Sequence, residues 1–175
     1  PGGLRLQVDG PLVSRSYVDL TASVMRGFGA EVAWSGDDEL VVAPGGYRAT
    51  RYEVEPDASA ASYLLAAAAM VPGARLRVTG VGDALQGDWG FADLLVRMGA
   101  DVVRQPDAIE VRGGAPLHGI TADLADLSDV AQTLAVVAAV ADGPTELTGI
   151  GFIRHKETDR IGNVVTELRR CGVDA

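Results

Sequence analysis

The feature that most constrains this chain is an internal repeat. Three times, apolar residues at helical spacing run into a glycine, and these glycines are Gly29, Gly99 and Gly172. They lie 70 and 73 residues apart (99 − 29 = 70 and 172 − 99 = 73). Each stands where a helix is expected to end in the left-handed conformation. A repeat of this length is one supersecondary unit, so we expect the chain to contain successive copies of one motif.

The middle copy, residues 52–112, can be interpreted along its whole length. Asp57 or Ser59 is placed to cap a helix, Pro72-Gly73 to end it, and Pro106-Asp107 to form a turn between two strands. The predicted elements are a strand at 52–54, a helix at 60–70, a strand at 74–79, a helix at 91–98, and strands at 101–104 and 109–112. This order, βαβαββ, predicts an α+β fold.

The other two copies are shorter. The first has only a strand at 4–8 ahead of its second helix, and the third begins near Ile120 and ends three residues after Gly172. The third copy is predicted to contain a helix at 128–141, a strand at 145–151 and a helix from 156 onward. We therefore expect the chain to be a piece of a longer protein, cut inside a repeat at both ends.

Charge and cysteine content exclude several classes of protein. The net charge of −9 repels nucleic acid, and the sequence has no basic stripe to follow a phosphate backbone. No apolar run approaches the roughly 20 residues that span a bilayer, and the opening residues do not form a signal peptide. Cys171 is the single cysteine, so no internal disulfide is expected, and His118 and His155 are too far apart for a histidine metal site. These features favour a cytoplasmic protein.

A charged run, Arg154 to Arg160, joins the last predicted strand to the last predicted helix. If the run occupies the first helical turn, Lys156, Glu157 and Arg160 converge on one small volume, because residues three and four apart share a helix face. The exposed backbone N–H groups of a helix start add partial positive charge, which suits a phosphate or a carboxylate. The alternative is a solvated helix start whose acids interact with the helix dipole.

Lys156 is the only lysine in the chain, since the other fourteen of its fifteen basic residues are arginine. Asp129 lies at the start of the apolar helix that precedes the charged run in the same copy. A carboxylate on one helix start and a lysine with a glutamate on the next can remove a proton from a hydroxyl and protonate a second atom. The alternative for Asp129 is a helix cap.

The equivalent turns of the other two copies differ in character. Ser14 with Arg15 and Tyr17 offers hydroxyl, guanidinium and backbone donors, which makes this turn a second candidate phosphate site, with an ordinary serine cap as the alternative. The turn Gln86-Gly87-Asp88 has no cation, and we predict a structural capping role for it.

Four strings of the sequence resemble one known family. They are SRSYVDLT at 14–21, VEPDASAASY at 54–63, QGD at 86–88 and RHKETDR at 154–160. In this order and spacing they are similar to the 5-enolpyruvylshikimate-3-phosphate synthases, or 3-phosphoshikimate 1-carboxyvinyltransferases. The resemblance implies transfer of the enolpyruvyl group of phosphoenolpyruvate to the 5-hydroxyl of shikimate 3-phosphate, on the route to aromatic amino acids, without cofactor or metal.

The resemblance also implies a fold and a set of roles. The fold is an inside-out α/β prism of two domains with three βαβαββ units each and substrates between them, so residues 1–55 and 56–175 are expected to belong to different domains. Ser14 and Tyr17 are implied to bind shikimate 3-phosphate, Asp129 to accept the 5-hydroxyl proton, and Lys156 to contact shikimate 3-phosphate and serve proton transfer. Glu157 is implied to be acid and base at the phosphoenolpyruvate methylene, and Arg160 to hold its carboxylate. The whole enzyme is expected to be a monomer.

The chain also departs from the pattern of the family. Phe152 stands where many relatives have an asparagine, and a phenyl ring cannot donate a hydrogen bond to a substrate. Several of the family's substrate ligands are absent from this sequence, so we expect the chain to be inactive alone. The alternatives are a relative of the UDP-N-acetylglucosamine enolpyruvyl transferases and a non-catalytic binding domain that keeps the repeat as a scaffold.

Overall fold

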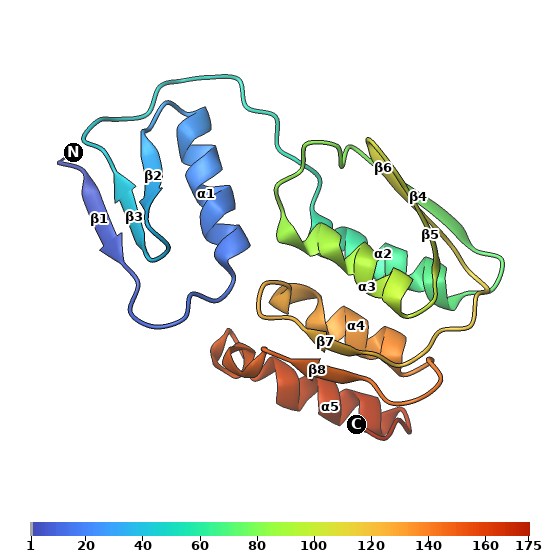
Figure 1. The fold of residues 1–175 in the computed structure, drawn as a ribbon. Coiled ribbons are helices and arrows are strands. Elements are labelled where there is room, and N and C mark those ends of the chain that lie inside the picture. The colour runs from blue at the N-terminus through green and yellow to red at the C-terminus, as the bar shows by residue number, and fades with distance from the viewer. Residues whose placement is uncertain (1) are drawn as a thin grey trace. The chain divides into compact units, whose positions relative to one another are not determined.

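The structure is a computed structural model that describes residues 2–175, and its chain divides into two compact units, Pro1–Val54 and Glu55–Ala175 (Figure 1). The assignment of these units to two domains of a longer protein stays a prediction. No helix among residues 2–175 has the length and apolar character needed to cross a membrane.

The first unit is a three-stranded antiparallel sheet with one helix. Its elements are β1 (Leu4–Gln7), α1 (Arg15–Gly27), β2 (Val32–Ser35) and β3 (Glu39–Val42). The strand order is β1-β3-β2, so the last strand lies in the middle. Its buried core is small, since Ala22 of α1, Val32 of β2 and Leu40 of β3 are its buried hydrophobic residues.

The second unit begins with the copy that the sequence predicts most fully. Its elements are α2 (Ala58–Met70), β4 (Arg75–Thr79), the 3-10 helix η1 (Gly87–Gly90), α3 (Phe91–Arg97), β5 (Asp101–Gln105) and β6 (Ala108–Arg112). Asp57 caps α2 by accepting a hydrogen bond from the backbone N–H of Ala60 at 2.9 Å, as predicted. The three strands form an antiparallel sheet in the order β4-β6-β5.

The last copy contains a parallel crossover. Its elements are β7 (Thr121–Asp123), the 3-10 helix η2 (Ser128–Val130), α4 (Ala131–Ala138), β8 (Glu146–Thr148), the 3-10 helix η3 (Gly151–His155) and α5 (Arg160–Arg170). Strands β7 and β8 pair in parallel, and α4 lies between them in the sequence. This arrangement brings the chain after β7 and the chain after β8 to the same end of the strand pair.

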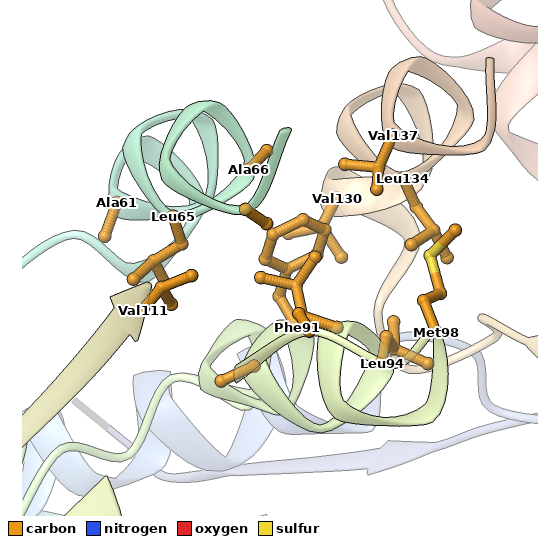
Figure 2. Packing of buried hydrophobic residues seen from close by; sticks show 14 of the residues in the cluster. Ala61, Leu65, Ala66, Phe91, Leu94, Met98, Val111, Val130, Leu134 and Val137 are labelled. Atoms are coloured by element: carbon orange, nitrogen blue, oxygen red, sulfur yellow. The ribbon is translucent and has the colours of Figure 1, made fainter. Parts of the chain in front are cut away.

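The core of the second unit lies among α2, α3 and α4. Figure 2 shows Leu65 of α2, Phe91 of α3, Met98 at the end of α3, and Leu134 of α4 pointing into one cluster. Phe91, Met98 and Leu134 are fully buried. Alanines on α2 allow close approach of the neighbouring helices, which is why a chain so poor in aromatic residues still packs well. This core fixes the helix starts that carry the candidate site.

The repeated glycines behave as predicted. Gly29, Gly99 and Gly172 each follow a helix, with φ of 89°, 96° and 83°. Two further glycines hold equivalent positions directly after strands, Gly80 after β4 and Gly149 after β8, with φ of 82° and 74°. Only glycine adopts such angles without a steric cost, so these positions set the direction of the chain after each strand.

Three predicted elements are wrong in part. Residues 52–54 form no strand, and Tyr52 instead stacks on Phe28 with ring centroids 5.4 Å apart. The strand predicted to reach residue 151 ends at Thr148, because Gly149 turns the backbone into the left-handed region. The helix predicted from Lys156 begins at Arg160, because the Asp159 carboxylate accepts a hydrogen bond from the N–H of Gly162 and so caps the helix there.

Candidate functional site

The candidate site of the second unit is built from two segments that follow the parallel strands. Asp129 lies in η2, ahead of α4, and Lys156, Glu157 and Arg160 lie between η3 and the first residue of α5. The sequence suggested that the charged run occupies the first turn of a helix. In the structure it is instead an irregular connection between a 3-10 helix and an α-helix. The predicted convergence of these side chains nevertheless occurs, through their contacts with Asp129.

One carboxylate oxygen binds both cations. Asp129 Oδ1 lies 2.5 Å from Lys156 Nζ and 2.6 Å from Arg160 Nη1. The Asp129 and Lys156 side chains are each 26% exposed and Arg160 is 19% exposed, so the contacts are partly shielded from water. Ion pairs in such surroundings are stronger than surface pairs. The two cations are thus held side by side over one acceptor.

Glu157 forms a paired hydrogen bond with Arg160. Nε of Arg160 donates to Oε1 and Nη2 donates to Oε2, both at 2.8 Å. This bidentate geometry holds the pKa of the Glu157 carboxyl below its usual range, with the Arg160 guanidinium as the main cause. The same pair, together with Asp129, raises the pKa of Arg160 further above neutrality. Arg160 is therefore a permanent cation that bridges two acids.

The remaining charges of the run have a structural role. Asp159 accepts from the N–H of Gly162 at 2.9 Å and from Arg154 Nη1 at 2.7 Å. These contacts lower the pKa of the Asp159 carboxyl, the backbone N–H of Gly162 being the largest cause. The interpretation of the acids as helix-dipole partners thus holds for Asp159. It does not describe Glu157, which binds a side chain that also contacts Asp129.

Sequence reasoning did not connect two residues of the site with Lys156. Ser128 Oγ accepts a hydrogen bond from Lys156 Nζ at 3.2 Å, and the Phe152 ring centroid lies 5.8 Å from the same nitrogen. A serine ahead of an aspartate and a phenylalanine in an apolar run are common in any sequence. The only indication in the sequence of a contact with Lys156 was that Phe152 lies four residues before it.

The candidate phosphate turn of the first unit has an unusual backbone. Ser14 precedes α1 with φ 56° and ψ 39°, the left-handed region that serine rarely adopts, and its side chain does not cap the helix. The ordinary serine cap is therefore wrong. Arg15 lies 4.2 Å over the Trp34 ring and donates to the carbonyl of Asp37 at 2.8 Å, which ties the start of α1 to the β2–β3 hairpin. Tyr17 lies on the first turn of α1.

The turn Gln86-Gly87-Asp88 makes contacts of the capping kind predicted for it. The Gln86 side chain accepts from the N–H of Ala58 at 2.8 Å and donates to the carbonyl of Pro56 at 2.9 Å. Asp88 is 2% exposed and accepts from the Ser59 hydroxyl. These bonds fasten the start of α3 to the start of α2.

The arrangement in the second unit suits anions and proton transfer. Two cations lie next to each other, and two carboxylates reach the same groups. A phosphate or carboxylate ligand would compete with the protein's own acids for Lys156 and Arg160. Among residues 2–175, no group of three or more His, Cys, Asp and Glu side chains is arranged to hold a metal ion.

Comparison with known proteins gives one consistent result. The family described as EPSP synthase (3-phosphoshikimate 1-carboxyvinyltransferase) matches residues 2–175. The 3-phosphoshikimate 1-carboxyvinyltransferase of Nostoc punctiforme is 46% identical over 169 residues, which are 95% of this chain and 39% of the relative. That of Aeromonas salmonicida is 41% identical over 99% of this chain and 40% of the relative. The chain therefore spans about 40% of the length of these curated relatives.

Solved structures agree with the sequence relatives. EPSP synthase from Acinetobacter baumannii matches with a TM-score of 0.77 and 28% identity, covering 96% of this chain and 39% of that one. The enolpyruvyl transferase NikO from Streptomyces tendae matches with a TM-score of 0.64 and 25% identity, covering 83% of this chain and 35% of that one. The predicted α+β fold of the enolpyruvyl transferases is confirmed by these matches.

Proposed function

The chain belongs to the EPSP synthase family, and from that premise we propose that it supplies part of the active site of an enolpyruvyl transferase. The proposed reaction moves the enolpyruvyl group of phosphoenolpyruvate to the 5-hydroxyl of shikimate 3-phosphate and releases phosphate. The observation that carries this proposal is the sharing of Asp129 Oδ1 by Lys156 and Arg160, with Glu157 paired to Arg160.

Asp129 and Lys156 are proposed to act on the attacking hydroxyl. Asp129 accepts the proton of the 5-hydroxyl as the oxygen forms a bond to the second carbon of phosphoenolpyruvate. Lys156, 2.5 Å from Asp129, contacts the phosphorylated substrate and provides a path for that proton. The partly shielded position of both side chains supports these roles, since proton transfer is more effective where water is limited.

Glu157 and Arg160 are proposed to act on phosphoenolpyruvate. Glu157 gives a proton to the methylene carbon during addition and takes one back when phosphate leaves, so its protonation state is restored. Arg160 binds the carboxylate of phosphoenolpyruvate through its planar guanidinium. Its bidentate contact with Glu157 supports this role, because a substrate carboxylate can occupy the same donors and release Glu157.

The first unit is proposed to bind the phosphate of shikimate 3-phosphate through Ser14 and Tyr17. The left-handed backbone at Ser14 is a strained conformation of the kind that clusters at functional sites, which supports a ligand role for this turn. We propose that no cofactor or metal takes part, that the whole enzyme is a monomer, and that it is cytoplasmic. The single cysteine, exposed and free, supports the last point.

Steady-state kinetics of the full-length protein encoded by the gene test this function. We expect turnover of shikimate 3-phosphate with phosphoenolpyruvate, and a fall of at least about 100-fold for Lys156→Met and for Glu157→Gln, because each removes a proton-transfer group. The matched control is Glu167→Gln, which alters an exposed Glu167–Arg170 pair on α5 and should leave turnover unchanged.

Two results would refute the proposal. One is a near-normal rate in both variants while circular dichroism shows that they are folded. The other is a preference for UDP-N-acetylglucosamine over shikimate 3-phosphate as the acceptor, which would assign the chain to the related transferases. NikO is an enolpyruvyl transferase whose structure also matches this chain, so the identity of the acceptor substrate has to be tested directly.

A further inference from the structure

The Lys156 ammonium has three neighbours that together define its position. Nζ donates to Asp129 Oδ1 at 2.5 Å and to Ser128 Oγ at 3.2 Å, and it lies 5.8 Å from the centroid of the Phe152 ring. Ser128 is fully buried, and Phe152 is half-buried against the core of the second unit. The lysine nitrogen is thus held from both segments of the site, by η2 and by η3.

Each neighbour acts on the ammonium in a different way. Asp129 supplies charge, the Ser128 hydroxyl supplies an acceptor fixed by burial, and the phenyl ring attracts a cation within about 6 Å of its centre. A phenyl ring also occupies space that water would otherwise fill. A lysine side chain has four flexible carbons, so its nitrogen keeps one position only when its surroundings impose it.

We propose that Phe152 and Ser128 are positioning residues for Lys156, holding its ammonium against Asp129 and limiting its contact with water. The proposal rests on the proposed function, in which Lys156 is catalytic. It also gives a role to Phe152, whose phenyl ring cannot donate a hydrogen bond. In this chain that position orients the lysine instead of donating a hydrogen bond to a substrate.

Chemical labelling of Lys156 separates this proposal from the proposed function. In the full-length protein, the rate of acetylation of Lys156 by acetic anhydride can be followed on its own peptide by mass spectrometry. Phe152→Leu keeps an apolar side chain but loses the ring, and Ser128→Ala loses the acceptor. We expect each to increase the labelling rate about fivefold, because both contacts stabilise and cover the ammonium. Phe152→Tyr keeps a ring and should label as the wild type does.

Kinetic constants supply the second measurement. Phe152→Leu and Ser128→Ala should lower kcat about fivefold while the KM for phosphoenolpyruvate changes less than about twofold, since only the lysine is displaced. The control is Phe28→Leu, which truncates a phenylalanine of the first unit and should leave Lys156 labelling unchanged.

The possible results lead to distinct conclusions. Wild-type labelling rates in both Phe152→Leu and Ser128→Ala would overturn the proposal, as would a Phe152→Tyr variant that labels as fast as Phe152→Leu. If the wild-type protein transfers no enolpyruvyl group yet the labelling responds as expected, the contact to Lys156 stands and the proposed function fails. If the enzyme is active and labelling does not respond, the proposed function stands and this inference fails.

Discussion

Two equivalent turns of the second unit each link a helix to the preceding helix, one through hydrogen bonds and the other through ion pairs. One turn, Leu85–Asp88, leads into η1 and α3, and the other, Arg154–Arg160, leads from η3 into α5. Each fastens its own helix to the start of the preceding helix of the same copy. In the first turn the links are Gln86 with Ala58 and Asp88 with Ser59. In the second they are the ion pairs that converge on Asp129.

The two turns differ in whether a ligand could take the place of the groups that link the helices. The polar groups of the first turn bind backbone groups and the half-buried hydroxyl of Ser59, and Asp88 is 2% exposed, so an anion has little access to Asp88. The second turn pairs partly exposed cations with acids, and Glu157 is 62% exposed. An incoming anion can replace those acids without leaving buried groups unsatisfied. The same repeat thus has a structural link between helices at one turn and the proposed ligand site at the other.

The largest effect that would test this comparison is on stability. Asp88→Ala should lower the free energy of unfolding by about 3 kcal/mol, because it deprives the Ser59 hydroxyl of a buried charged acceptor and leaves a cavity. Lys156→Met should cost less than about 1 kcal/mol, since Asp129 keeps its ion pair with Arg160 and is not left as an unpaired charge. Urea denaturation followed by circular dichroism measures both.

A conservative variant provides the control for Asp88. Asp88→Asn keeps the volume and an acceptor oxygen for Ser59, so it should cost less than half as much as Asp88→Ala. If Asp88→Ala and Lys156→Met destabilise the protein equally, the distinction between a structural turn at Asp88 and a ligand-binding turn at Lys156 is wrong.

A smaller effect is expected at the glycines that precede the two turns. Gly80 and Gly149 both have positive φ, so an alanine at either costs about 1 kcal/mol in backbone strain. At Gly80 the new methyl group would lie 3.1 Å from the Pro56 ring, whereas at Gly149 it would lie 2.1 Å from Asp123 Oδ1. That oxygen accepts a hydrogen bond from the N–H of Ala125 and cannot move freely.

Gly149→Ala should therefore cost about 1 kcal/mol more than Gly80→Ala and should also lower activity, because η3, which leads to Lys156, begins two residues after Gly149. The same denaturation experiment provides the comparison. The double variant Asp123→Ala/Gly149→Ala removes the clashing oxygen and should recover part of the loss. If Gly80→Ala lowers the free energy of unfolding more than Gly149→Ala does, the close approach of Asp123 Oδ1 at Gly149 does not affect stability as proposed.

Sequence reasoning reached the fold through features that are local and repeated. The glycines after the helices, the Asp57 cap and the Pro106-Asp107 turn each express a preference of a few residues, and the structure follows them. The meeting of Asp129 with Lys156 was also predictable, because parallel strands bring the segments that follow them to one end. The roles of these residues in a reaction remain predictions.

Other features depend on contacts that no local pattern contains. The left-handed Ser14 contradicts the preference of serine, and Arg15 with Trp34 ties down the helix that follows it. Residues 52–54 have a strand-like pattern, yet Tyr52 packs on Phe28 instead. The late start of α5 depends on the Asp159 cap, whose carboxylate accepts a hydrogen bond from the N–H of Gly162.

The smallest expected effect concerns the protonation of Glu157 and tests whether a ligand can take the place of Glu157 on Arg160. Arg160 holds the pKa of this carboxyl below its usual range, so in the native state it stays ionised to lower pH than in the unfolded chain. Its contribution to stability is therefore present above the ordinary glutamate pKa of about 4.3 and is lost as the pH falls through the lowered value. Glu157→Gln should flatten the acid side of the stability profile where the pH falls below the ordinary glutamate pKa.

Carbon-13 NMR of the Glu157 carboxyl can follow the same group with and without phosphoenolpyruvate. If a substrate carboxylate takes the Arg160 donors, Glu157 loses the main cause of its lowered pKa and should titrate at a higher pH in the complex. That rise would make it a better proton donor to carbon when substrate is bound. An unchanged titration in a saturated complex would mean that Glu157 and Arg160 remain paired, and that this turn is as fixed as the one at Asp88.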